Sequence, residues 1–333
     1  MIRGTGSLRR VRIERYILRR LVFAVVLTVV ALTINFLIIH LAPGDPVAIL
    51  AGETGGGADY YEEMRHRLGL DRPLLEQYAR FVSSALAGDL GTSIAYRAPV
   101  MDVILSRLGP TLLLMIPSIL IASVLGIVLG VSAGQRAGSL TDDGLSILSL
   151  LGASIPSFWL GQLLVLLFAV HLGLLPVQGI VNARTQLEGW DLLADVARHT
   201  VLPVATLSLV HFTLIARLVR TSIRDVSRTN YIRTAYAKGL PRRRIWYRHG
   251  LRNALLPVVT VIGSQFGSVL SGAVLVETIF AWPGIGRLLY ESTLARDYPV
   301  LLGILFVVSV GIALANLLTD LTYLLLDPRV EYR

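Results

Sequence analysis

Six long apolar runs constrain this chain more than any other feature. Crossing about 30 Å of hydrocarbon takes roughly 20 helical residues at a rise of about 1.5 Å each. Barrel strands would be shorter and would alternate in polarity. Since apolar residues make up 54% of the 333 residues and charged ones 16%, a soluble fold would lack polar surface. The sequence therefore predicts an all-α polytopic membrane protein whose six transmembrane helices cover Leu21–Leu41, Leu112–Ala133, Leu145–Leu172, Thr200–Val219, Leu255–Phe280 and Pro299–Leu326.

The distribution of arginine predicts the orientation in the membrane. Seven arginines fall within the first twenty residues, so this end should stay in the cytoplasm. An even number of spans returns the C-terminus to the same side. Basic residues kept on the cytoplasmic side then explain most of the net charge of +9, which is therefore not interpreted as a sign of nucleic-acid binding. The predicted segments are a cytoplasmic N-terminus at 1–20, a first span at 21–41, an outer loop region at 42–108, a transmembrane core (TM2–TM6) at 109–326 and a cytoplasmic C-terminus at 327–333.

The first apolar run is interpreted as a retained helix. It is longer than the core of a signal peptide, which has about 7–15 apolar residues, and no small-x-small cleavage site follows it. In the outer loop, Tyr60–Leu68 and Leu74–Leu86 have helical patterning. The chain has no cysteine, and its six histidines show no pair at ligand spacing. We therefore expect no metal site and no cofactor in this chain.

The most informative polar segment is the loop Arg220–Asn253, which the topology assigns to the cytoplasm. It contains ten of the 31 basic residues. Asn230 is placed to cap a short helix, and Gly239 to end it in the left-handed conformation. Pro241 suits the first position of a second helix over Arg242–Leu251. The pattern predicts a compact helical knob that projects from the membrane.

Two small residues, Ala235 and Gly239, lie four positions apart and would leave a gap on one helix face where a partner could sit. A basic juxtamembrane helix attracted to anionic lipid is the alternative. That alternative explains the arginines but not the break at Gly239 and Pro241.

Small residues and prolines indicate how the spans pack. Rows of small residues four apart let membrane helices approach closely, and prolines can kink a span. The rows are Gly126, Gly130 and Gly134, and Gly263, Gly267 and Ser271; Pro117, Pro156 and Pro203 interrupt the second to fourth spans, and Pro257 starts the fifth.

Polar residues within the spans are candidates for a translocation path, because such groups usually face the interior of a bundle or an aqueous route. No row of carboxylates crosses the middle of the membrane, which argues against a proton-coupled carrier. The candidates are Ser154, Ser157, Gln265, Ser268, Ser271, Asn316 and Asp320.

Several motifs resemble those of the permease subunits of bacterial ABC importers, in particular the dipeptide/oligopeptide group. That family has a cytoplasmic loop with Glu-Ala-Ala, three residues and Gly, at which this chain has Arg233, Thr234, Ala235 and Gly239. The first two positions depart from the general motif and resemble the version found in the peptide group. The family's Ile-x-Leu-Pro is also altered, with its proline delayed to Pro257. Further matching segments, in order along the chain, are Ala42–Pro46, Gly88–Gly91, Ser154–Phe158, Glu277–Gly284, Ala295–Pro299 and Asp327–Arg329.

The resemblance implies half of a path for di- or oligopeptides, with nickel, glutathione or sugar substrates as open alternatives. It implies a second related permease, two cytoplasmic ABC ATPase domains, an extracellular solute-binding protein and a surrounding bacterial inner membrane. It also implies ATPase-coupling residues at Arg233, Thr234, Ala235, Lys238, Gly239, Leu240, Pro241, Arg242 and Arg243, and outer-mouth or structural motifs at Pro43, Gly44, Asp45, Glu277, Trp282, Pro283 and Gly284.

Enzymatic activity is expected to reside in partners. The chain has no G-x-x-x-x-G-K-[ST], and its sole lysine, Lys238, precedes Gly239 instead of following a phosphate-binding loop. ATP and Mg²⁺ therefore belong to the partner ATPases. Two other classes stay open: a stand-alone channel or ion-coupled carrier, and a membrane-embedded enzyme that uses Ser154 with His171 or Asp320 with His211.

Overall fold

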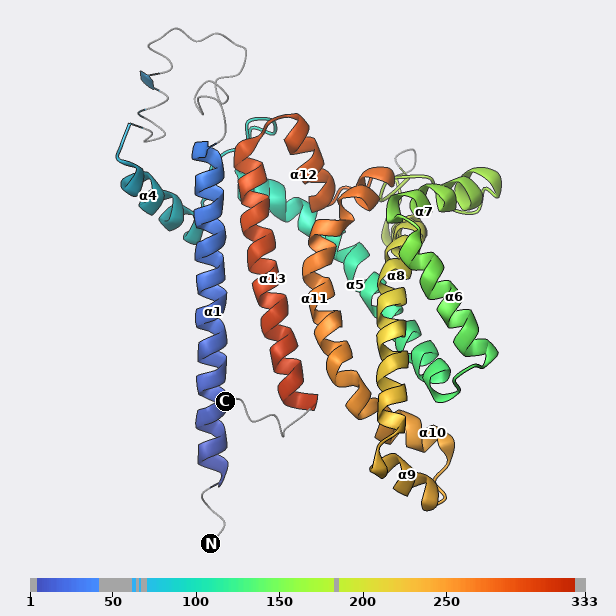
Figure 1. The fold of residues 1–333 in the computed structure, drawn as a ribbon. Helices are drawn as coiled ribbons and strands as arrows, with labels where there is room; N and C mark the ends of the chain where they lie inside the picture. The colour runs from blue at the N-terminus through green and yellow to red at the C-terminus, as the bar shows by residue number, and fades with distance from the viewer. Residues whose placement is uncertain (1–4, 42–61, 64–65, 67–70, 183–185, 327–333) are drawn as a thin grey trace. The chain divides into compact units, whose positions relative to one another are not determined.

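The computed structural model describes residues 5–41, 62–63, 66, 71–182 and 186–326, of which the side chains of 5–17, 39, 266–272, 321 and 323–326 are left undescribed (Figure 1). The described part is helical and contains one isolated β-bridge, between Thr92 and Pro99, but no strand. Two compact units divide the chain: residues 1–107 with 288–314, and residues 108–287 with 315–333.

The first unit contains α1 (Thr5–Leu41), α4 (Leu74–Leu86), the first residues of α5 (Val100–Gln135) and most of α13 (Tyr298–Leu326). Leu32 of α1, Ala85 of α4 and Phe306 of α13 form its apolar core. The helix predicted at Leu74–Leu86 is confirmed with the same bounds, whereas most of the one predicted at Tyr60–Leu68 lies outside the described residues.

A buried carboxylate organises the loop that precedes α5. Asp297 accepts hydrogen bonds from the Ser93 hydroxyl at 2.5 Å and from the amide of Ala95 at 3.1 Å. The side chain of Asp297 is fully buried, so these donors replace the water that the carboxylate loses on folding. Asp297 thereby fastens the turn before α5 to the turn before α13.

The second unit is organised around α8 (Gly189–Ser227), which is contacted by α6 (Leu140–Ser154), α7 (Ser157–Leu164) and α11 (Leu251–Ile279). After α7 the chain widens into a π-helical turn, η1 (Val165–His171). Between α8 and α11 lie α9 (Asn230–Ala237), α10 (Arg242–Arg244) and a second π-helical turn, η2 (Ile245–Gly250). The short helix α12 (Ile285–Leu294) follows α11 and continues into the first unit.

The predicted close approach at the first glycine row is confirmed. A Cβ on Gly130 would lie 2.7 Å from the carbonyl oxygen of Ala216 and 2.7 Å from Cβ of Val219. Gly126 and Gly134 meet Ile215 and Ile223 in the same way, so α5 and α8 are in backbone contact along the row. In the second row, Gly263 packs against Thr319 of α13, but Gly267 and Ser271 lie outside the described side chains.

Four helices in the described part are long and apolar enough to span a membrane: Leu18–Ile38, Val100–Gln135, Gly189–Ser227 and Tyr298–Asp320. They contain most of the first, second, fourth and sixth predicted runs. The fifth run falls in α11, where residues 266–272 lack described side chains. Adding the bent pair α6–α7 gives five spans, so the described residues do not reach the predicted count of six.

The third predicted span is not one continuous helix, and the interruption predicted at Pro156 is confirmed. The segment Leu145–Leu172 is bent by 102° between Ser154 and Ser157. Pro156 has no amide hydrogen and takes an extended conformation, with ψ of 136°, as the N-cap of α7. Pro117 and Pro203, by contrast, lie inside the continuous helices α5 and α8. Pro257 does not start the fifth helix, because α11 begins at Leu251.

Candidate docking knob and its anchoring network

A helical knob, residues 228–244, projects between the end of α8 and the start of η2 (Figure 1). The helix α9 begins at Asn230 with Thr229 as its N-cap, one residue earlier than predicted, and the hydroxyl of Thr229 donates to the Val226 carbonyl oxygen. Gly239 has φ of +66°, which confirms the predicted left-handed end of the helix. The amides of Gly239 and Leu240 donate to the carbonyl oxygens of Tyr236 and Ala235, at 2.9 and 3.3 Å.

The second helix of the knob does not end at Leu251. Pro241 is the N-cap of α10, and the chain runs on through η2 into α11 with helical backbone at both junctions. The knob is therefore joined to α11 by continuous helix, whereas Arg228 and Thr229 are the only residues between α8 and α9. This continuity gives the knob a stiff connection to a long helix of the bundle.

The inner face of the knob is apolar and buried. Ile232 and Ala235 of α9 share a core with Ile245 and Trp246 of η2 and with residues of α5, α6, α8 and α11. The Asn253 amide of α11 donates a hydrogen bond to the Tyr231 hydroxyl of α9 at 2.8 Å. The predicted gap at Ala235 is wrong, because this side chain is buried inside the knob. A partner could touch the surface around Gly239 but not Ala235.

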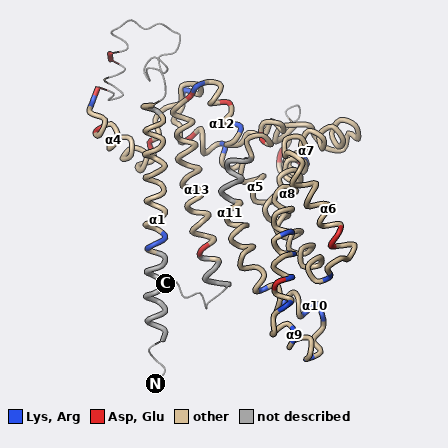
Figure 2. Tube along the Cα trace, in the orientation of Figure 1, with Lys and Arg blue, Asp and Glu red and all other residues tan. Residues whose placement is uncertain are grey.

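The outer face carries most of the other residues that the sequence assigned to coupling. Leu240 is half-buried. The exposed residues are Arg233, Thr234, Lys238, Gly239, Pro241, Arg242 and Arg243. A Cβ on Gly239 would meet no atom within 4 Å. Figure 2 shows Lys and Arg gathered over α9, α10 and the adjoining end of α8. The knob thus presents a basic, exposed surface on an apolar, rigid base.

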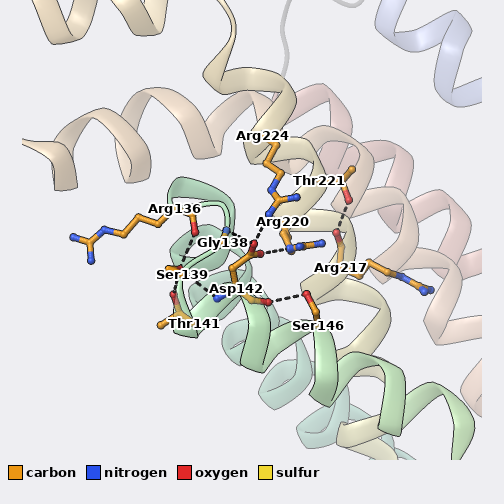
Figure 3. A network of polar contacts seen from close by, with 10 residues as sticks. All are labelled: Arg136, Gly138, Ser139, Thr141, Asp142, Ser146, Arg217, Arg220, Thr221 and Arg224. Carbon is orange, nitrogen blue, oxygen red and sulfur yellow. Dashed lines mark hydrogen bonds and ion pairs between the residues drawn. The ribbon is translucent and has the colours of Figure 1, made fainter.

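Next to the knob, one buried carboxylate joins α6 to α8 (Figure 3). Asp142 in the first turn of α6 accepts hydrogen bonds from the amide of Gly138 at 2.9 Å, from Nε of Arg220 and from Nη2 of Arg224 at 2.5 Å. Its side chain is 4% exposed. We call Asp142, Arg220 and Arg224 the arginine clamp. The arginine clamp was not predicted from the sequence. One local signal was present, because Ser139, three positions before Asp142, is a typical N-cap residue and marks the start of α6.

The outer-mouth motif forms a cap for α12. Glu277 is fully buried, and its carboxylate accepts from the Thr111 hydroxyl at 2.8 Å and from the Arg287 amide at 3.0 Å. The amide of Ile285 donates to the same hydroxyl at 2.8 Å. A Cβ on Gly284 would overlap the Glu277 carboxylate, so only glycine fits there. No local motif around Thr111 pointed to this contact, because its partner is 166 residues away.

The indole of Trp282 in the same motif is buried and donates to the Pro110 carbonyl oxygen at 2.9 Å. Pro283 is half-buried. Pro43, Gly44 and Asp45 lie outside the described residues. The described part of this motif thus has a structural role at the start of α12.

The candidate path residues are scattered. Gln265 is paired with His211, its amide nitrogen 2.6 Å from Nδ1 of the ring. The Ser154 hydroxyl donates to the carbonyl oxygen of Leu150 on its own helix, and Asn316 is exposed. Ser157 and Asp320 are half-buried, and Ser268 and Ser271 lie outside the described side chains. In the described residues, no group of three or more His, Cys, Asp or Glu could hold a metal ion.

Comparison with known sequences decides the family. Residues 126–332 match the model of the binding-protein-dependent transport system inner membrane component, and residues 13–115 match the model of its N-terminal region. The chain belongs to this family. It is an integral membrane protein, as the apolar helices require.

Relatives of known function match nearly the whole chain. The dipeptide transport system permease protein DppB of Escherichia coli K12 is 39% identical over 96% of this chain and 99% of its own length. The oligopeptide transport system permease protein AppB of Bacillus subtilis is 36% identical, over 95% and 99%. The glutathione transport system permease protein GsiC of Escherichia coli O6:H1 is 38% identical, over 96% and 99%.

The fold is also similar to a solved structure, an inward-facing crystal form of the MetNI methionine ABC transporter. The TM-score is 0.54 at 17% identity, over 68% of this chain and 97% of the other. This likeness confirms the all-α fold.

Proposed function

We propose that this permease forms half of a translocation path for short peptides and is driven by cytoplasmic ATPases that dock on the knob. The observation that carries the proposal is the knob itself, whose inner face is locked into the core while its outer face is basic and exposed. A docked partner that moves such a knob would also move α11, because the two are joined by continuous helix.

The proposed assembly contains a second, related permease, two ABC ATPase domains that bind ATP and Mg²⁺, and an extracellular solute-binding protein that delivers substrate. ATP binding would bias a two-state bundle through the knob. The chain itself contributes no ATPase site, which agrees with the absence of a phosphate-binding motif from its sequence. Both termini and the knob would face the cytoplasm, as the arginine distribution predicts.

Short peptides are proposed as substrate because the names of three relatives specify dipeptide, oligopeptide and glutathione transport. Uptake into vesicles that contain the complete transporter and its binding protein tests this assignment. Labelled di- and tripeptides should be accumulated with ATP and not without it. Accumulation of a nickel complex or a sugar, with no uptake of peptide, would assign the chain to another substrate class.

The docking role is tested by Gly239→Asp. The new carboxylate would point into the space where the partner sits and would place negative charge among basic residues, so uptake should fall at least tenfold while insertion is retained. Gly173→Asp is the matched control. Gly173 also has a positive φ, +62°, and its Cβ would also meet nothing within 4 Å, but it lies in the loop after η1, away from the knob.

Both variants carry the same backbone strain, about 1–2 kcal/mol for a non-glycine residue in the left-handed region. A difference between them therefore reports the surface and not the strain. Equal uptake by the two variants would refute docking at Gly239.

A further inference from the structure

The arginine clamp sits where the knob meets the bundle. Arg220 and Arg224 are one turn apart on α8, and α8 ends at Ser227, three residues beyond Arg224. Asp142 lies in the first turn of α6, just after the turn that connects α5 with α6. The clamp thus fastens the α5–α6 turn to the last part of α8 before the chain enters the knob.

Geometry selects these two arginines from four nearby. In Figure 3 the side chains of Arg220 and Arg224 reach the Asp142 carboxylate, whereas those of Arg136 and Arg217 point away from it. Arg136 and Arg217 are exposed, but Arg220 and Arg224 are half-buried. The clamp is therefore a built arrangement and not a general consequence of a basic surface.

The arginine clamp contains one acidic group and two basic groups. A single carboxylate serves two guanidinium groups that lie four residues apart, and like charges at this spacing repel each other on a helix. Charge-assisted hydrogen bonds are about twice as strong as neutral ones. Removal of the carboxylate would leave the two arginines without their common acceptor, so the α5–α6 turn would lose its polar attachment to α8.

The apolar core at the inner face of the knob also connects α5 and α6 with α8. It combines Ala133 of α5, Leu145 of α6 and Ile223 of α8 with the inner face of the knob. Apolar contacts resist separation but have little directional preference. Hydrogen bonds from two guanidinium groups to one carboxylate fix the direction and the register of the contact.

We propose that Asp142 is a positioning residue for energy coupling: through the arginine clamp it makes α5 and α6 move together with α8 when the knob is displaced. The proposal rests on the proposed docking role of the knob. Without the clamp, part of the displacement would be lost at the α5–α6 turn, so ATP would be hydrolysed with less substrate carried.

Asp142→Asn is the primary test, in the complete transporter reconstituted with its binding protein. It keeps the side-chain shape and removes the charge. Asp143→Asn is the matched control, since Asp143 is the next residue of the same helix turn and is exposed. We expect Asp142→Asn to lower the substrate carried per ATP hydrolysed at least fivefold, with ATPase binding retained, and Asp143→Asn to leave this ratio within twofold of the parent protein. A ratio in Asp142→Asn equal to that in Asp143→Asn overturns the proposal.

A second pair of variants keeps the proposal testable if Asp142→Asn does not fold. Arg224→Gln removes one of the two guanidinium groups and should lower the ratio by an intermediate factor. Arg217→Gln, on the same helix but directed away from the carboxylate, should not change it. Equal ratios in these two variants count against the clamp as clearly as the first comparison does.

A distance measurement separates positioning from general stability. The chain has no cysteine, so cysteines at the exposed positions Ala137 and Thr234 can be spin-labelled selectively in a transporter whose partners are also freed of cysteine. Asp142→Asn should broaden the distance distribution between the two labels, and Asp143→Asn should not. An unchanged distribution in Asp142→Asn refutes the proposal.

The failure of this proposal differs from a failure of the docking role. If Gly239→Asp abolishes ATPase binding but Asp142→Asn carries as much substrate per ATP hydrolysed as the parent protein, the ATPases dock on the knob and the clamp is not needed for coupling. If Gly239→Asp binds the ATPases and transports like Gly173→Asp, the docking role itself is wrong.

Discussion

Substitution of Gly130 by alanine should destabilise the protein, although alanine is the better helix former. The new Cβ would lie 2.7 Å from the carbonyl oxygen of Ala216 and 2.7 Å from Cβ of Val219. One of these atoms belongs to the backbone of α8, so it cannot turn away as the end of a flexible side chain can. The helices α5 and α8 must then separate locally. Overpacking of this kind costs about 1–3 kcal/mol.

Gly144→Ala in α6 is the matched control. Gly144 is exposed, and a Cβ there would meet nothing within 4 Å. Helix propensity alone favours alanine over glycine by about 0.8–1 kcal/mol. Both substitutions gain this propensity, so they should differ by the overpacking cost alone, about 1–3 kcal/mol, with Gly130→Ala the less stable of the two.

The assay is thermal inactivation of the purified protein in mild detergent, followed by the loss of monodisperse protein. Gly130→Ala should lose its folded form at a lower temperature than the parent, and Gly144→Ala at the same or a higher temperature. Equal midpoints for the two variants would refute the close approach of α5 and α8 at this row.

Three further predictions concern buried acids and the path. Glu277→Ala leaves the donors at the start of α12 without an acceptor and should cost about 1–3 kcal/mol, measured by the same thermal assay; Glu277→Gln should cost less because one oxygen remains. Asp297→Ala removes an acceptor from a fully buried site and should cost a similar amount, and it should also increase proteolysis of the loop before α5. Replacement of Gln265, Ser268 and Asn316 together by alanine should reduce uptake while the protein still inserts; unchanged uptake would exclude these residues from the path.

The helices could be predicted from sequence because their signals are local. Apolar runs located most of the long helices, and Leu74–Leu86 has the amphipathic pattern of its helix. Gly239 could be predicted in the left-handed conformation because the residues beside it mark a helix end. Such features depend on a few neighbouring residues, which a single sequence displays.

Features that depend on distant pairs were not predictable. Asp142 is 78 and 82 residues away from its arginine partners, and Thr111 is 166 residues away from Glu277. The interruption at Pro156 was predicted but its angle was not, since a proline in an apolar run indicates a break and not its size. Ala235 was assigned to the wrong face, because a small residue on a short helix can equally well fill an internal contact.

Photo-crosslinking from the knob tests the central claim most directly. A photoreactive residue at the exposed position Lys238 in the native membrane should yield a covalent adduct with an ATPase that carries a phosphate-binding motif. The same residue at Gly173 should not yield that adduct. Adducts with lipid alone at Lys238, and no protein partner, would contradict the account and support a knob that only binds the membrane surface.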